Sequence, residues 1–84
     1  MMHILYFASL REALGTGSED VEPPLQTATV ADLVVWLQTR GGRWTETLSS
    51  EKRWRVAVNR QLVGLEGRVK AGDEVAFFPP VTGG

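Results

Sequence analysis

The 84-residue sequence contains no cysteine, and it has a single histidine, His3. Without a thiol the chain can form no disulfide, thiolate nucleophile or cysteine-ligated metal site. A lone histidine has no companions with which to hold a metal ion, so we expect His3 to be structural or solvated and expect no metal site. Chemistry that involves this protein must therefore use another kind of group.

Long apolar runs and a charge excess are absent as well. No run of about 18 apolar residues occurs, and no basic leader followed by an apolar core and a small-residue cleavage site opens the chain. We therefore expect neither a membrane span nor a signal peptide, and we place the protein in the cytoplasm. The net charge of −1 indicates neither a nucleic-acid nor a membrane partner.

The residues that are present describe an ordinary folded domain. Hydrophobic residues make up 43% of the chain and charged residues 23%, which argues against disorder over most of its length. A chain of this length forms one domain with a single modest core.

The first third of the chain predicts a strand, a short helix and an edge strand. Residues 3–8 (HILYFA) are apolar and rich in β-forming residues, which favours a central strand. The next segment, SLREALG, predicts a helical turn with Ser9 as N-cap, Glu12 three residues later and Gly15 as its stop. After a loop, GTGSED, the segment EDVEPPL allows a brief edge strand that its two prolines must end.

The best-marked element is a helix in the middle of the chain. Thr29 and Asp32 make a capping-box pattern, and Gly41 and Gly42 mark the end of the helix. Apolar residues follow the cap at helical spacing: Val30, Leu33, Val34 and Leu37.

The second half predicts a further helical turn and two strands. Residues 44–48 suit a short helix. The segment WRVAVN alternates, with Trp54, Val56 and Val58 on one face and Arg55 and Ala57 on the other, which predicts a strand with one buried face. NRQLVGLEGRVKAGDE is interpreted as a turn-rich connection, with Gly72 and Asp73 at the turn into a last strand, Glu74 to Phe78.

One dominant helix against a small sheet built from both chain ends predicts an α+β domain over residues 1–78 and an extended tail over residues 79–84. The predicted core comprises Leu33, Val34, Leu37, Val56, Val58, Val75 and Phe77.

Four segments, YFASLREALG, TVADLVVWL, VAVNRQLV and GDEVAFFPPVTGG, together resemble the small, sulfur-carrier subunit of molybdopterin synthase. The likeness runs in the right order over nearly the whole chain, and the terminal block is highly specific. It implies the β-grasp fold of ubiquitin, a mixed sheet wrapped around one main helix, with a flexible C-terminal tail.

The residue types of the tail, residues 79–84, also predict its conformation and its use. Pro79 and Pro80 lack an N–H and hold φ near −65°, so the sheet cannot continue and the chain leaves it stiff and extended. At roughly 3.3 Å per residue the tail reaches about 20 Å, enough to enter a neighbour's active site. Gly83 and Gly84 can thread a passage too narrow for side chains, while Val81 and Thr82 space the tail. The predicted functional group is the carboxylate of Gly84.

The resemblance implies what that carboxylate does. A ubiquitin-activating-like adenylyltransferase uses ATP to adenylate the terminal glycine, and sulfur from a cysteine desulfurase route then replaces AMP to give a thiocarboxylate. The tail enters the large subunit of the synthase, in a heterotetramer, and its sulfur passes to cyclic pyranopterin monophosphate. Catalytic side chains belong to that large subunit, so this chain is a sulfur donor that binds no cofactor stably.

Strand parity predicts the surface that meets this partner. If Ile4 and Tyr6 point toward the helix, Phe7 faces away, and so does Phe78. Because one helix cannot cover both sheet faces, Phe7 and Phe78, joined by Leu62, are expected to form an exposed apolar interface at the base of the tail.

Other interpretations of the same residues stay open. A sulfur carrier of another pathway, such as thiamine thiazole synthesis, would share the tail and its activation; a protein modifier would join Gly84 to lysine instead; a pure interaction module would need no free carboxylate. Asp73 and Glu74 are expected to shape a turn rather than share a proton. The basic residues of the middle are expected to be solvated or to face a partner: Arg40, Arg43, Lys52, Arg53, Arg55 and Arg60.

Overall fold

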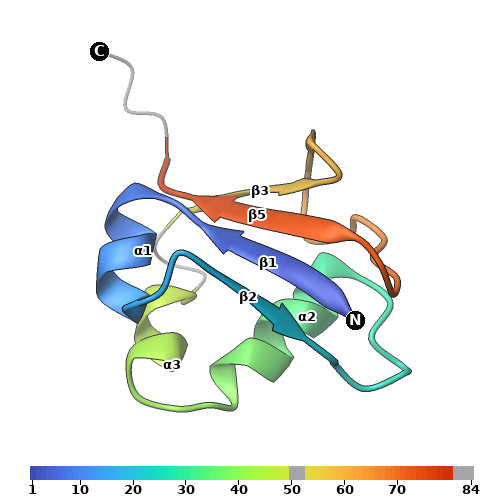
Figure 1. Ribbon diagram of the computed structural model, residues 1–84, viewed down its shortest axis with the longest axis horizontal. Helices are drawn as coiled ribbons and strands as arrows, with labels where there is room; N and C mark the ends of the chain where they lie inside the picture. The colour runs from blue at the N-terminus through green and yellow to red at the C-terminus, as the bar shows by residue number, and fades with distance from the viewer. Residues whose placement is uncertain (50–52, 81–84) are drawn as a thin grey trace.

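The computed structural model describes residues 1–49 and 53–80 and contains eight elements (Figure 1). In chain order they are β1 (Met2–Tyr6), α1 (Ala8–Leu14), β2 (Ser18–Val21), α2 (Val30–Gln38), α3 (Arg43–Thr47), β3 (Arg55–Val58), β4 (Gln61–Val63) and β5 (Glu74–Phe78). Predictions that concern Lys52, Val81, Thr82, Gly83 and Gly84 lie outside the described residues.

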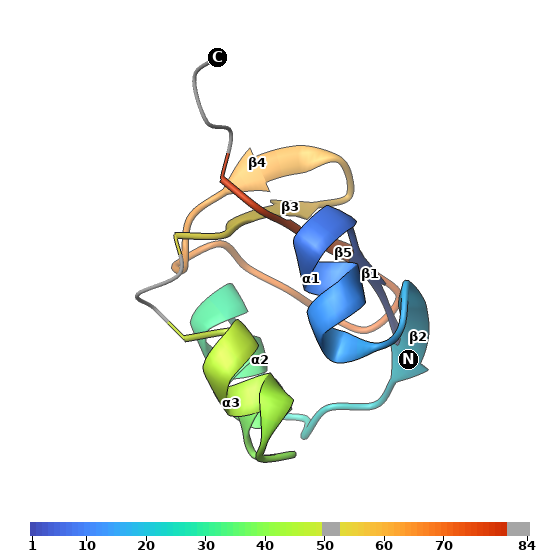
Figure 2. The same cartoon turned by 90° about the vertical axis from the view of Figure 1, so that its left-hand side faces the viewer.

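The five strands form one mixed sheet in the order β2-β1-β5-β3-β4. β1 and β5 run parallel in its centre, and the other neighbours are antiparallel. The sheet curves around α2 and α3, which lie on the same side of it (Figures 1 and 2). The prediction of an α+β domain with a sheet made from both chain ends is therefore confirmed.

The cap of α2 forms as its sequence predicts. The Thr29 hydroxyl accepts a hydrogen bond from the Asp32 N–H at 3.2 Å, and the Asp32 carboxylate accepts from the N–H groups of Ala28 and Thr29 at 3.0 and 3.2 Å. These two backbone hydrogen bonds hold the pKa of Asp32 below its ordinary value, because they favour the ionised carboxylate. The capping box thus fixes where α2 begins.

All seven predicted core residues are buried. Four aromatic rings contact one another in sequence beside this core. Trp54 meets Phe77 edge-on, with 5.3 Å between ring centroids, and Phe77 stacks on Tyr6 at 6.0 Å. Tyr6 in turn meets Trp44 edge-on at 5.6 Å. These contacts cross the layer between sheet and helices and link Trp54, the residue before β3, and strand β5 to β1 and α3.

Arg40 is exposed, as expected for the basic residues of the middle of the chain, but its guanidinium also has fixed partners. Its guanidinium lies over the Trp44 ring, 4.4 Å from the centroid, and bonds the Glu19 carboxylate at 2.8 Å. Glu19 in turn accepts a hydrogen bond from the Tyr6 hydroxyl at 2.9 Å. Burial, followed by this bond, raises the pKa of Tyr6 far above its usual range. Arg40 therefore ends a chain of polar contacts that runs from the buried Tyr6 through the partly buried Glu19 to the surface, which the basic composition of the region did not reveal.

The predicted start of α1 is wrong. Its N-cap is Phe7, not Ser9, and no side chain caps it, so no capping box with Glu12 forms. The reason is that β1 pairing continues through the Phe7 N–H to the Phe77 carbonyl at 3.0 Å, and the chain then reverses at Ala8 with φ of 49°. The predicted stop is confirmed, because Gly15 takes the left-handed conformation with φ of 76°.

The connection after β3 holds a strand that the sequence interpretation missed. Val58 pairs with Gln61, which leaves Asn59 and Arg60 as a two-residue hairpin turn, both with positive φ. The signal was the dipeptide between VAV and QLV, because such turns need positive φ at both positions and asparagine accepts it readily. A second difference is Ala57, which is buried although it faces away from the helices.

Candidate functional site at the end of β5

The tail leaves from the middle of the sheet. β5 lies between β1 and β3, and its last residue, Phe78, pairs with Arg55. Pro79 and Pro80 follow directly and leave the ladder, as prolines must, because they have no N–H to donate. The strand Glu74–Phe78 has the predicted bounds. The root of the tail is thus held on both sides by neighbouring strands.

The face of the sheet opposite the helices is apolar along its centre. The strand register places Leu5 beside Ala76, Ala76 beside Ala57, and Ala57 beside Leu62, in one row across four strands. Alternation puts this row on the face that α2 and α3 do not cover. The side chains of Ala76 and Ala57 on the two inner strands are small, so the larger side chains of Leu5 and Leu62 at the ends of the row extend further from the sheet.

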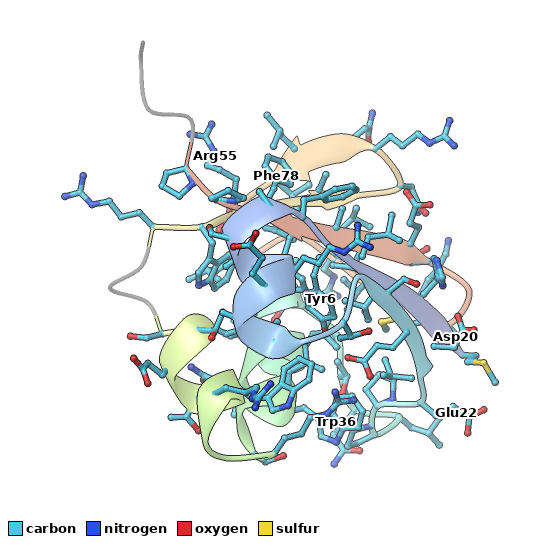
Figure 3. The ribbon with its side chains drawn as sticks, turned by 60° about the vertical axis from the view of Figure 1, so that its left-hand side comes forward. Tyr6, Asp20, Glu22, Trp36, Arg55 and Phe78 are labelled. Carbon is cyan, nitrogen blue, oxygen red and sulfur yellow. The ribbon has the colours of Figure 1, made fainter. Side chains whose placement is uncertain are left out.

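We call Phe7, Leu62 and Phe78, together with that row, the outer patch. Leu62 is 61% exposed and Phe7 48% exposed, while Phe78 is half-buried. Phe78 and Arg55 lie together where the chain leaves the sheet, and Tyr6 lies in the layer beneath (Figure 3). The three predicted interface residues therefore belong to one uncovered sheet face; their role in binding stays a prediction.

The polar candidates are structural. His3 is exposed and bonds the Asp20 carboxylate at 2.7 Å. Asp73 is buried and accepts hydrogen bonds from the Lys70 N–H at 2.9 Å and the Asn59 side-chain amide at 3.0 Å, which confirms that it shapes a turn. Within residues 1–49 and 53–80, no group of three or more His, Cys, Asp or Glu side chains is arranged to hold a metal ion. The reactive residue proposed by the sequence, Gly84, lies outside the described part.

The sheet order, the helix that it wraps around and the tail that follows the central strand define a ubiquitin-like β-grasp protein. The chain belongs to the ThiS family, whose sequence model matches residues 4–84. It is similar to the molybdopterin synthase sulfur carrier subunits of Haemophilus influenzae (42% identical) and Escherichia coli (40% identical), in each case over 100% of both chains.

The fold is similar to the crystal structure of SAMP1 from Haloferax volcanii. The TM-score is 0.74 and the identity 30%, and the match covers 99% of this chain and 98% of that one. In the part of the chain that the structure describes, no helix is both long and apolar enough to cross a membrane.

Proposed function

We propose that this protein is the sulfur carrier of molybdenum cofactor biosynthesis. The observation that carries the proposal is the identity of 42% over the full length of a molybdopterin synthase sulfur carrier subunit. The geometry supports it, since the sequence PPVTGG follows a strand anchored in the centre of the sheet and begins beside the uncovered outer patch. The chain thus leaves the sheet after Phe78 next to a surface able to dock a partner.

The chemistry takes place at the Gly84 carboxylate. A carboxylate is a poor electrophile, because its charge repels nucleophiles and its leaving group would be oxide. Attack of a carboxylate oxygen on the α-phosphorus of ATP releases pyrophosphate and gives an acyl adenylate. A sulfur nucleophile then displaces AMP, and the product is a thiocarboxylate. This cycle stores sulfur without a thiol side chain, which is consistent with the absence of cysteine.

Two protein partners follow from this cycle. An adenylyltransferase related to ubiquitin-activating enzymes activates the tail in the cytoplasm, where ATP is available. The large subunit of molybdopterin synthase then receives the tail, in a heterotetramer, and directs its sulfur to cyclic pyranopterin monophosphate. The outer patch supports this proposal, because an apolar face with a few large exposed side chains suits a docking surface.

The decisive test is the mass of the C-terminus after activation. Incubated with the adenylyltransferase, ATP and a sulfur donor, the wild-type chain should exchange one carboxylate oxygen for sulfur. A chain extended by one alanine should not, because the reactive carbon is then out of register. Gly84→Ala should lose most of the product, and Gly83→Ala less, since residue 83 only threads the passage. Sulfuration of the untrimmed extended chain would contradict the mechanism.

A protein modifier is the second candidate, favoured by the likeness to SAMP1, which is a small archaeal modifier protein. That function would use the same adenylate but transfer Gly84 to a lysine amine. The chemical state of Gly84 in extracts of cells that express the tagged chain distinguishes the modifier from the sulfur carrier. Isopeptide-linked Gly84 on lysine would support the modifier, and a free thiocarboxylate without such adducts would support the carrier.

A further inference from the structure

A small cleft lies at the base of the tail on the helix side of the sheet, away from the outer patch. Its volume is about 250 Å³. Three parts of the chain besides the tail contribute to it: α1, α3 and the residue before β3. The lining residues are Ser9, Leu10, Ala13, Glu46, Thr47, Trp54, Pro79 and Pro80. The first two residues of the tail are thus one wall of this cleft.

Another part of the lining is the aromatic ring of Trp54, which its neighbours hold in place. Trp54 contacts Phe77 edge-on, and its indole N–H donates to the Ser49 carbonyl at 3.2 Å. These contacts hold the indole in place from two directions. Pro79 and Pro80 have restricted backbones of their own. A side chain that entered the cleft would therefore meet surfaces that need little ordering, which lowers the entropic cost of binding.

Among the described residues that line the cleft, Glu46 is the charged one. This side chain is exposed, and in residues 1–49 and 53–80 no ion pair includes it. Arg43 is the basic residue on the same helix, but its guanidinium lies beside Gly15, 3.0 Å from where a Cβ would stand. Among the described residues the carboxylate of Glu46 therefore has no ion-pair partner, and it lines the same cleft as the Trp54 indole.

We propose that this cleft receives an arginine side chain of the protein that accepts the tail. A guanidinium stacks on an indole face and pairs with a carboxylate at the same time, which a lysine ammonium does less well. The cleft is smaller than the roughly 300 to 1,000 Å³ of small-molecule sites, and this favours a single side chain. The chain's own terminal carboxylate is excluded as occupant, because Glu46 would repel it.

The proposal rests on the proposed function and adds a second contact to it. The outer patch would hold the partner on one side of the root of the tail, and the arginine in the cleft would hold it on the other. Both contacts would form only when the tail is inserted, so the cleft would help to fix the direction in which the tail leaves the domain.

The experiment measures the dissociation constant of the complex with the large synthase subunit by calorimetry. Glu46→Gln keeps the size of the side chain and removes its charge, so affinity should fall about three- to tenfold. Added salt should weaken the wild-type complex more than this variant. Glu22→Gln removes an exposed carboxylate outside the cleft and is the matched control, for which affinity should not change. Trp54→Leu should also weaken the complex.

An arginine-to-alanine scan of the large subunit identifies the occupant. One substitution should weaken binding to the wild type yet have little further effect on Glu46→Gln, because the two side chains form one interaction. Affinity of Glu46→Gln equal to wild type, or additive effects at every arginine, would overturn the proposal. If the wild type is sulfurated and binds while the cleft variants are unaffected, only the cleft assignment fails; if it is neither sulfurated nor bound, the sulfur-carrier function itself fails.

Discussion

Asp32 shows how much of an element one side chain can determine. It is exposed, yet its carboxylate accepts hydrogen bonds from two backbone N–H groups that precede α2 and would otherwise have no intrahelical partner. Negative charge at a helix N-terminus is favourable as well. The lowered pKa of Asp32 is the consequence of these bonds to the ionised form.

The cap of α2 should therefore make folding stability depend on pH. Because the folded pKa of Asp32 lies below its ordinary value of 3.8, the stabilisation is fully present above the unfolded pKa and is lost as pH falls through the folded pKa. Asp32→Asn should lower the melting temperature at pH 7, and the gap from wild type should close below that folded pKa. Melting curves from pH 7 to about pH 2 measure this.

Thr29→Ala is the matched control for that titration. It removes an uncharged cap and should cost about 1 kcal/mol of unfolding free energy. It should cost nearly as much at acid pH as at neutral pH, as long as the domain is folded. A melting-temperature gap for Asp32→Asn that stays constant down to pH 2 would show that the charge of Asp32 is not the stabilising factor.

Among the elements, the β3–β4 hairpin has backbone strain in its two-residue turn. Asn59 and Arg60 have φ of 49° and 70°. Two side-chain hydrogen bonds compensate for the strain at Asn59. Its amide N–H donates to the Asp73 carboxylate, and its amide oxygen accepts from the Glu74 N–H. Arg60 is exposed, and within residues 1–49 and 53–80 its side chain makes no hydrogen bond or ion pair that would compensate for its left-handed backbone. In this turn, the backbone strain is therefore compensated at Asn59 but not at Arg60.

Arg60→Gly should stabilise the domain. Glycine adopts positive φ without the Cβ penalty of about 1 to 2 kcal/mol, and the flexibility that it adds to the unfolded chain offsets part of this gain. We expect a net increase of about 0.5 to 1 kcal/mol in the free energy of unfolding, measured by urea titration. Arg60→Ala keeps the strain and serves as control. Equal stability of the glycine and alanine variants would refute the strain argument.

Elements marked by two independent signals were predictable from sequence. α2 has both a capping box and helical periodicity, and β5 has an apolar run bounded by a Gly-Asp turn and two prolines. The start of α1 was not predictable, because strand pairing by Phe7 decided it and that contact is distant in sequence. β4 has only three residues, too few for a periodic pattern to show.

For the molecule as a whole, the two sheet faces have separate tasks. One face packs the core that holds the fold, and the other carries the outer patch. Parity of β1 and β5 predicted this division from sequence, since Ile4 and Tyr6 are buried while Phe7 is exposed. Sequence did not predict the cleft beside Trp54, which requires α1, α3 and the root of the tail to meet.

The division predicts that binding and folding can be changed separately. Phe78→Ala should weaken the complex with the large subunit by more than about 1 kcal/mol, because a large apolar side chain beside the tail is lost. The fold should remain intact, with an unchanged circular dichroism spectrum. Val35→Ala truncates an exposed apolar residue on α2, away from the outer patch, and should leave affinity unchanged. Equal affinity of Phe78→Ala and wild type would remove Phe78 from the interface.

The central place of β5 also has a mechanical consequence. If the tail enters a partner as proposed, it must later be withdrawn, and the pull is transmitted to Phe78 and the rest of β5. β5 is hydrogen-bonded to β1 on one side and β3 on the other, so a pull along its axis loads both ladders at once in shear. An edge strand such as β4 would instead peel away bond by bond. On the proposed function, this arrangement favours withdrawal of the tail with the domain still folded.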